Sequence, residues 1–156
     1  MSKIKIPLAA IDEAERLQAI SVIAFNANFE KYGHFPSGIE SADWHKEQIR
    51  QGIYHKIIYE DRLIGGVFLS LNPNQEMKIE YLYISPDYQN KKVGRTVMEL
   101  IEDQYKEIKK WFLLTPYKDF GNHHFYDKLG YKKVGELKPD ENNEFKLFQY
   151  EKITNT

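Results

Sequence analysis

The stretch from Tyr81 to Glu99 combines several features of an anion-binding site. An apolar segment ends at Pro86, a polar loop follows, and an amphipathic helix is expected from Val93 onward. Backbone N–H groups at the start of a helix lack intrahelical acceptors and lie at the positive end of the helix dipole, so they hold phosphate groups well. Gly94 allows close backbone approach, and nearby cations are Lys91, Lys92 and Arg95. Taken alone, this stretch is equally compatible with a solvated basic loop before an ordinary helix.

A second stretch, from Asp119 to Tyr131, has the sequence DFGNHHFYDKLGY and predicts a short helix that ends at Gly130. Its adjacent histidines, His123 and His124, diverge by about 100° on a helix and cannot grip one metal ion as an i, i+4 pair would. The chain has no cysteine, and its other histidines are scattered. We therefore expect no metal site.

Together the two stretches resemble the signatures of the GNAT (Gcn5-related) N-acetyltransferase superfamily. The first signature, Gln/Arg-x-x-Gly-x-Gly/Ala after a strand ending in proline, is similar to Leu82–Pro86 followed by Gln89 and Val93-Gly94, with Lys92 at the first glycine position. The second is similar to Phe125–Tyr131. Its usual asparagine position holds Asp119, and Asn122 could supply the amide instead.

This resemblance implies an α/β fold with a mixed sheet, acetyl-CoA as co-substrate and an amine as acceptor. It implies that backbone amides of Leu82, Tyr83 and Ile84 line the pantetheine and polarise the thioester carbonyl. It also implies that Asn122 and Tyr126 contact the cofactor. The pyrophosphate would be bound by Gln89, Asn90, Lys91, Lys92, Val93, Gly94 and Arg95.

Acetyl transfer requires an acid and a base, because an ammonium must lose a proton and the leaving thiolate gains from receiving one. The resemblance assigns the acid to Tyr126. It assigns the base to Glu80, as in the polyamine acetyltransferase branch, through water. Glu80 lies an even number of residues before Ile84, so both side chains are expected on one face of the sheet. The alternatives are a packed aromatic ring for Tyr126 and a solvated or ion-paired carboxylate for Glu80.

The acceptor is expected beside the aromatic segment that precedes Trp44, because in GNAT proteins the connection between the first two helices lies over the acceptor cleft. The expected substrate-binding residues are Phe29, Tyr32, His34 and Phe35. A plain hydrophobic flap over the core would account for the same residues.

The elements that must position these residues follow from the hydrophobic pattern. Asp12 and Glu15 have capping-box spacing and predict a helix that runs to about Glu30. Residues 52–85 predict a three-stranded meander. The remaining expected elements are a strand at 4–6, helices at 42–50, 93–110 and 122–129, and strands at 111–115, 131–134 and 144–150.

Composition narrows the class of protein. The 156 residues fit one domain, residues 1–156, and 42% hydrophobic residues are enough for one core. A net charge of −1 disfavours nucleic acid and anionic lipid as partners. The absence of cysteine, signal peptide and membrane-length apolar segment favours a cytoplasmic protein. A homodimer through the last strands would suit Phe145, Phe148 and Tyr150, which could equally be core residues.

Two functions from different classes remain on sequence grounds. The first is an N-acetyltransferase that acts on the primary amine of an unidentified small molecule or peptide. The second is a non-catalytic sensor or interaction module that binds acetyl-CoA, suggested by Lys92 at the glycine position. Walker-type, GxSxG and GxGxxG motifs do not occur, so NTPase, α/β-hydrolase and dinucleotide-binding assignments are not first choices.

Overall fold

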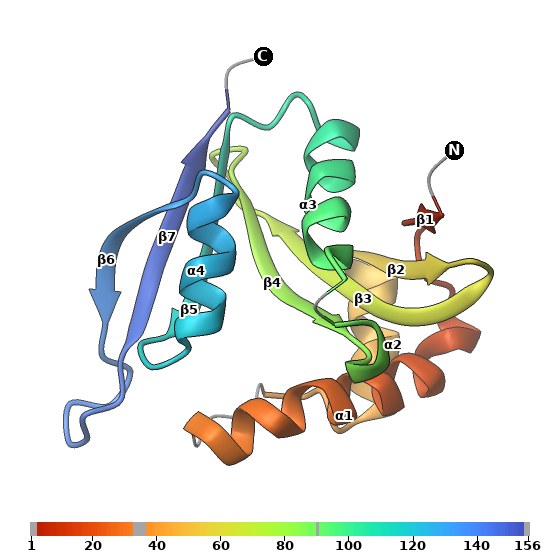
Figure 1. Ribbon diagram of the computed structural model, residues 1–156, viewed down its shortest axis with the longest axis horizontal. Coiled ribbons are helices and arrows are strands. Elements are labelled where there is room, and N and C mark those ends of the chain that lie inside the picture. Colours follow the sequence, from red (N-terminus) through yellow and green to blue (C-terminus); the bar gives the residue numbers. More distant parts are fainter. Residues whose placement is uncertain (1–2, 33–36, 90, 155–156) are drawn as a thin grey trace.

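The protein folds around a single seven-stranded mixed sheet, shown in the computed structural model of Figure 1. The structure describes residues 3–32, 37–89 and 91–154, and for residues 27–32 it describes the backbone alone. The sheet order is β1-β2-β3-β4-β5-β7-β6. The strands are β1 (Ile4–Lys5), β2 (Ile53–Tyr59), β3 (Arg62–Leu71), β4 (Met77–Ile84), β5 (Lys110–Pro116), β6 (Lys132–Leu137) and β7 (Leu147–Ile153). The helices are α1 (Ala14–Tyr32), α2 (Ala42–Gln51), α3 (Val93–Gln104) and α4 (Phe120–Lys128), with 3-10 turns at Ile11–Glu13 and Pro86–Tyr88.

The expected α/β class with a mixed sheet is confirmed, and the three-stranded meander is β2, β3 and β4. Glu60 and Asp61 connect β2 to β3 and both have positive φ, 46° and 68°. A two-residue hairpin loop with this conformation twists in the same sense as the strands it joins.

Helices cover both faces of the sheet. On one face, Leu17 and Ala24 of α1 and Trp44 of α2 pack against Tyr54, Phe68 and Tyr83 of the meander. On the other face, a larger cluster joins α3 and Tyr126 of α4 to the strands. In α3 the buried side chains recur at helical spacing: Val93, Val97, Met98 and Ile101.

Strands β4 and β5 are parallel neighbours that stay together only at their first residues, through Met77↔Trp111 and Lys78↔Phe112. Beyond these pairs the two ribbons diverge, as Figure 1 shows. Antiparallel pairing continues on the outer side of each strand, to β3 and to β7. The sheet is therefore open along one edge of β4 and one edge of β5.

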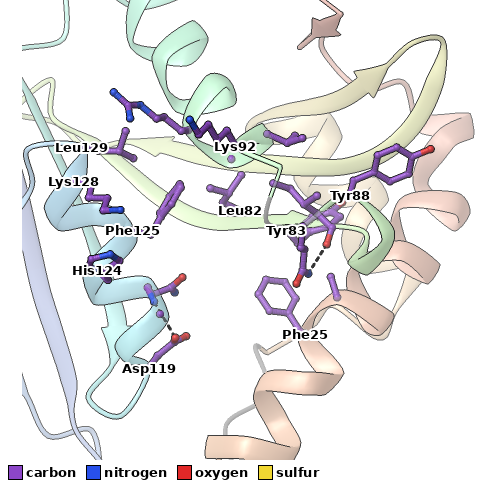
Figure 2. Close-up of a pocket in the computed structure, with 18 residues that line it drawn as sticks. Phe25, Leu82, Tyr83, Tyr88, Lys92, Asp119, His124, Phe125, Lys128 and Leu129 are labelled. Carbon is purple, nitrogen blue, oxygen red and sulfur yellow. Dashed lines mark hydrogen bonds between the residues drawn. The ribbon is translucent and has the colours of Figure 1, made fainter.

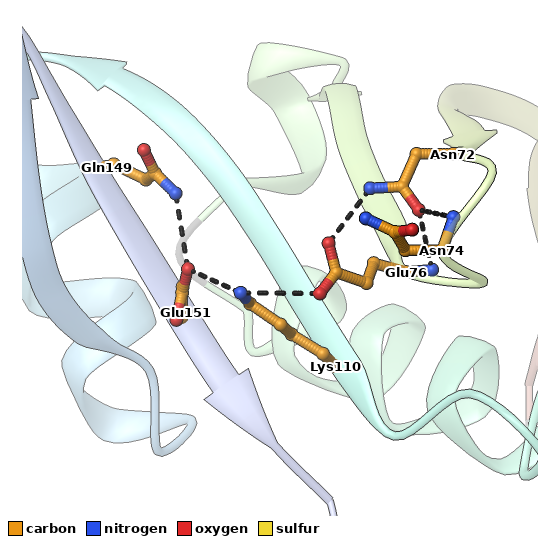
Figure 3. A network of polar contacts seen from close by, with 6 residues as sticks. All are labelled: Asn72, Asn74, Glu76, Lys110, Gln149 and Glu151. Atoms are coloured by element: carbon orange, nitrogen blue, oxygen red, sulfur yellow. Dashed lines mark hydrogen bonds and ion pairs between the residues drawn. The ribbon is translucent and has the colours of Figure 1, made fainter.

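A polar network joins the strands near the residues where β4 and β5 are still paired (Figure 3). Lys110, at the start of β5, forms ion pairs with Glu76 at 3.4 Å and with Glu151 of β7 at 3.0 Å. Asn72 donates to Glu76 at 2.9 Å, and Gln149 donates to Glu151 at 3.2 Å. Three neighbouring strands are thus joined where the opening begins.

A β-bulge interrupts the β3–β4 pairing, and Glu80 is its extra residue, since Phe68 pairs with Tyr81 and Leu69 with Ile79. The bulge reverses the alternation of side chains: Ile79 and Ile84 both pack with the α3 cluster, although they are an odd number of residues apart. Glu80 is bonded to Lys78 and lies on the α1/α2 side with Tyr81. The expectation that Glu80 and Ile84 share a face is wrong.

Three further expectations differ from the structure. The capping interaction before α1 is made by Glu13, whose carboxylate accepts from the backbone N–H of Ala10 at 2.8 Å, in place of the Asp12–Glu15 pair. Tyr150 is buried in the core and Phe148 packs against it, so these side chains do not form an exposed face. The 93–110 helix ends earlier, at Gln104.

Candidate active site

A pocket of about 750 Å³ lies where β4 and β5 diverge (Figure 2). Its walls come from four parts of the chain: α1, the end of β4, the loop and first turn of α3, and α4. The lining residues are Ala24, Phe25, Leu82, Tyr83, Ile84, Tyr88, Gln89, Lys92, Val93, Gly94, Arg95, Asp119, Gly121, Asn122, His124, Phe125, Lys128 and Leu129. Most of the residues expected to bind the cofactor are therefore brought together.

The edge of β4 forms the floor of the pocket. Leu82, Tyr83 and Ile84 pair with β3 on one side, and β5 accompanies β4 only as far as Lys78. The backbone groups on the open side of β4 consequently face the pocket in the part of the chain that the structure describes. Such groups can bond an extended ligand in the way that a neighbouring strand would.

Lys92 immediately precedes α3 and has a left-handed backbone conformation, with φ 62° and ψ 16°. Glycine adopts this conformation without strain, and lysine does so at a cost. The first intrahelical bond runs from Thr96 N–H to the Lys92 carbonyl at 3.1 Å. The N–H groups of Val93, Gly94 and Arg95 therefore have no acceptor within the helix. Because these residues line the pocket, the N–H groups can bind an anion there.

The remaining residues of this loop differ in position. Gln89 donates to the carbonyl of Ile84 at 2.8 Å and so folds the loop back onto the end of β4. Lys91 is exposed, with its ammonium 5.7 Å from the ring centre of Tyr88, and does not line the pocket. Asn90 lies outside the described residues. A side chain on Gly94 would come within 3.2 Å of the Phe125 ring, so glycine permits the close approach of α3 to α4.

Helix α4 is tied to the end of β5. Asp119 caps the helix, and its Oδ1 accepts from the backbone N–H of Asn122 at 3.1 Å. The side-chain amide of Asn122 donates to the buried hydroxyl of Thr115 at 3.2 Å. Asn122 thus lies in the pocket, as expected for an amide of the second signature.

Tyr126 packs beside the pocket and does not line it. It is 4% exposed and belongs to the α3-side core. Its ring meets those of Phe125 and Tyr131 edge to face, with centroid distances of 4.8 and 5.3 Å. Burial, and secondly the negative charge of Asp119, raises the pKa of Tyr126 well above its usual range. Its hydroxyl therefore remains protonated at neutral pH.

Glu80 is held by two neighbours on the α1/α2 side of the sheet. Its carboxylate accepts from the Ser70 hydroxyl at 2.6 Å and forms an ion pair with Lys78 at 3.0 Å. Glu80 is not among the residues that line the pocket.

Helix α1, which holds two of the residues expected to contact the acceptor, contributes Ala24 and Phe25 to the pocket. The Phe25 ring lies 5.9 Å from those of Tyr81 and Tyr83. The expected side chains of Phe29, Tyr32, His34 and Phe35 lie outside the described residues. The ring of Trp44 packs against that of Tyr81, with 5.6 Å between the ring centres.

Sequence reasoning missed several lining residues, namely Ala24, Phe25, Tyr88, Gly121, His124, Phe125, Lys128 and Leu129. Helical spacing was the available signal in α4, because Gly121, His124, Phe125 and Lys128 recur at intervals of three and four. For α1, the sequence predicts one apolar face, but it does not indicate which residues of that face pack in the core and which line a pocket.

The described residues contain no group of three or more histidine, aspartate or glutamate side chains placed to hold a metal ion. No helix among them combines the length and the apolar character needed to cross a membrane.

Comparison with known proteins places the chain among acetyltransferases. The model of the acetyltransferase (GNAT) family matches residues 14–131. The uncharacterized protein YrkN of Bacillus subtilis is 30% identical over 84 residues, which cover 53% of this chain and 45% of that protein. The match thus spans about half the length of this relative.

Solved structures share the fold. The PaiA N-acetyltransferase from Thermoplasma acidophilum, in complex with coenzyme A, has a TM-score of 0.79 and 22% identity over 99% of this chain and 100% of that one. The ribosomal-protein-S18-alanine N-acetyltransferase from Escherichia coli has a TM-score of 0.76 and 13% identity over 96% and 93% of the two chains. At these identities the likeness concerns the fold alone.

Proposed function

Because the chain belongs to the acetyltransferase (GNAT) family, we propose that it transfers the acetyl group of acetyl-CoA to the primary amine of a small molecule or peptide. The observation that carries this proposal is the pocket at the open edge of β4, bounded at one end by the first turn of α3. An extended ligand with phosphates at one end suits a groove with a strand edge along it and helix N–H groups at its end.

The pyrophosphate would lie at the start of α3. Val93, Gly94 and Arg95 of the first turn of α3 and the cationic residue Lys92 before it line this end of the pocket, which supports the proposed role. Lys92 has the left-handed conformation that glycine adopts readily and lysine adopts at a cost. Its backbone can still take part in binding the pyrophosphate, because this conformation is compatible with lysine.

The acetyl end of the cofactor would lie along β4, where the amides of Leu82 to Ile84 can polarise the thioester carbonyl. Tyr126 is the proposed acid for the leaving thiolate. Its hydroxyl carries a proton at neutral pH, as an ordinary tyrosine does, and burial raises its pKa further. Its ring packs against Phe125, which lines the pocket.

Glu80 is the proposed base. The bulge places its carboxylate on the α1/α2 side of the sheet, where Phe25 enters the pocket, and Ser70 and Lys78 hold it in position. Because Glu80 does not line the pocket, a proton from the amine would reach it through water. Glu80→Gln should then lower kcat without changing the affinity for acetyl-CoA.

Similar folds with bound cofactor support the proposal. The PaiA structure contains coenzyme A, and the microcin C7 self-immunity acetyltransferase MccE, with a TM-score of 0.76 to this chain and 15% identity, was solved with acetyl-CoA and AMP. A cytoplasmic location and a homodimeric state stay predictions. A chain without cysteine suits a reducing compartment.

The first experiment is a calorimetric titration of the protein with acetyl-CoA, followed by an assay of free thiol release with a panel of amines. Binding together with thiol release for one class of amine supports the enzyme. Binding without release from any amine would favour the sensor or interaction module. Arg95→Gln should weaken acetyl-CoA binding, whereas Arg50→Gln, on α2 in an ion pair with Glu47, should not.

A further inference from the structure

Cationic residues line the pocket on two sides. Lys92 and Arg95 belong to the start of α3, and Lys128 belongs to α4. Figure 2 shows Lys92 beside the first turn of α3 and Lys128 on the wall that α4 forms. The pyrophosphate is assigned above to the α3 side, so Lys128 has no role in that assignment.

Lys128 lies at the end of the pocket where α3 begins. It follows Asn122 by six residues, which is about 9 Å along the axis of α4. Phe125 of α4 approaches the first turn of α3, since a side chain on Gly94 would come within 3.2 Å of its ring. Residues three apart on a helix are neighbours on its surface. Lys128 therefore lies next to the contact between the two helices.

The charge of Lys128 has no partner within the protein. Lys128 is exposed, and among the described residues its ammonium has no ion pair or hydrogen bond. Arg95 differs, because it forms an ion pair with Glu99 at 3.6 Å. Lys128 also lies in the last turn of α4, where the helix dipole favours a cation. That effect stabilises the helix and leaves the N–H donors of the ammonium available to a ligand.

Coenzyme A carries a phosphate group besides its pyrophosphate. This phosphomonoester is attached to the 3′-oxygen of the ribose, and a group of this kind carries a charge of about −1.5 to −2 at neutral pH. The pyrophosphate is attached to the 5′-oxygen of the same ribose, so both phosphate groups belong to one nucleotide. A cation beside the pyrophosphate site is therefore suitably placed for the phosphomonoester.

We propose that the ammonium of Lys128 binds the 3′-phosphate of coenzyme A, so that this pocket distinguishes coenzyme A from 3′-dephospho-coenzyme A. The proposal rests on the acetyl-transfer function above, which assigns the pyrophosphate to the start of α3. It makes Lys128 a residue that determines specificity for the cofactor. The proposed acid and base, Tyr126 and Glu80, keep their roles.

The expected contribution is modest because the contact is exposed. Water and salt screen an ion pair at the surface, and such a pair changes an equilibrium constant by up to about five-fold. The 3′-phosphate carries more than one negative charge, which places this contact toward the upper end of that range. Because screening grows with ionic strength, the contribution should shrink as salt is added.

The test is a calorimetric titration of the parent and of Lys128→Gln with coenzyme A and with 3′-dephospho-coenzyme A, at low ionic strength. We expect the parent to bind coenzyme A about five-fold more tightly than the dephospho form. In Lys128→Gln the two affinities should become about equal, through a loss for coenzyme A alone. Lys132→Gln is the matched control and should keep the preference, because Lys132 is an exposed lysine outside the pocket.

A purely structural role of Lys128, or a contact with the pyrophosphate, would give a different result. In either case Lys128→Gln would weaken the binding of both ligands equally, which overturns the proposal. A preference that persists in Lys128→Gln, or a parent that binds both ligands equally or neither, would overturn it too. Thiol release from acetyl-CoA is measured separately. A protein that shows the preference dependent on Lys128 but releases no thiol with any amine refutes the transferase function alone.

Discussion

The side-chain amide of Asn122 donates a hydrogen bond to the hydroxyl of Thr115 across 3.2 Å, and this contact joins the pocket face of α4 to β5. Thr115 is 1% exposed, so its hydroxyl has little access to water. The bond fixes the Asn122 amide in the pocket wall. The position of Asn122, within the second signature, therefore depends on Thr115, which lies outside that signature.

Thr115→Val tests this dependence, because valine has nearly the same shape and lacks the hydroxyl. We expect a loss of about 1 to 2 kcal/mol in the free energy of unfolding, since the buried amide loses its acceptor. Acetyl-CoA affinity should also fall. Denaturant unfolding and calorimetry check both effects. In a double-mutant cycle with Asn122→Ala, purely additive effects would show that the bond is unimportant.

Tyr126→Phe removes the proposed acid while preserving the packed ring. We expect kcat to fall about 100-fold, the scale of general acid catalysis, with acetyl-CoA affinity unchanged. Tyr131→Phe is the control, because Tyr131 packs against Tyr126 but bonds Glu102. Steady-state kinetics of the two variants measure the loss of kcat. A Tyr126→Phe variant as active as the parent would exclude the acid role.

Lys92→Gly should stabilise the protein. The left-handed conformation at this position costs lysine about 1 kcal/mol, which glycine avoids. Lys91→Gly is the matched control, because Lys91 is also exposed but is not among the residues with positive φ. In thermal and denaturant unfolding, the free energy of unfolding of Lys92→Gly should exceed that of Lys91→Gly by about 1 kcal/mol. A reversed order would show that the lysine side chain makes a contact worth more than the strain.

Acidification should destabilise the protein through two buried histidines. Burial lowers the pKa of His45 and of His55, although hydrogen bonds to the carbonyls of Ile39 and Ile6 partly oppose this. Below about pH 6.5 the unfolded chain binds protons that the folded chain excludes, so stability falls with pH until the lowered values are reached.

Each histidine should contribute up to about 1.4 kcal/mol per pH unit in that window. Unfolding measured from about pH 8 to pH 5 gives the slope. His55→Gln should reduce it. An unaltered slope in His55→Gln would mean that His55 does not carry the effect.

Glu13→Ala should destabilise the start of α1. The Glu13 carboxylate accepts from Ala10 N–H at 2.8 Å and from Lys56 at 2.6 Å. Burial raises its pKa, but the bonds from Lys56 and Ala10 outweigh burial and leave the pKa lowered. We expect a loss of about 1 to 2 kcal/mol at neutral pH.

The stabilisation from Glu13 is present above the pKa of an unfolded glutamate and disappears as pH falls through the lower folded value. The difference between Glu13→Ala and the parent should therefore vanish in acid, as urea unfolding at about pH 7 and pH 3 can show. Glu15→Ala is the control, because Glu15 is exposed in the first turn of α1, two residues further along the chain. A difference that persists unchanged in acid would contradict the electrostatic origin.

Local pattern was enough to predict much of the fold and of the cofactor groove. The alternation in β2, β3 and β4 and the helical spacing of Val93, Val97 and Ile101 depend on neighbours in sequence, and these elements formed as expected. The loop before α3 and the Phe125–Tyr131 stretch were found in the same way, since each motif is contiguous. Periodicity and short motifs are properties of the chain itself.

Long-range contacts decided the rest. The bulge at Glu80 reversed the face of that side chain because it depends on the register between β3 and β4, which no single strand encodes. Asp119 became the carboxylate of the pocket because the divergence of β4 and β5 opened a cavity beside it. Sequence determines which residues can do chemistry, and packing between distant segments determines which of them meet, because burial and register are set by partners far along the chain.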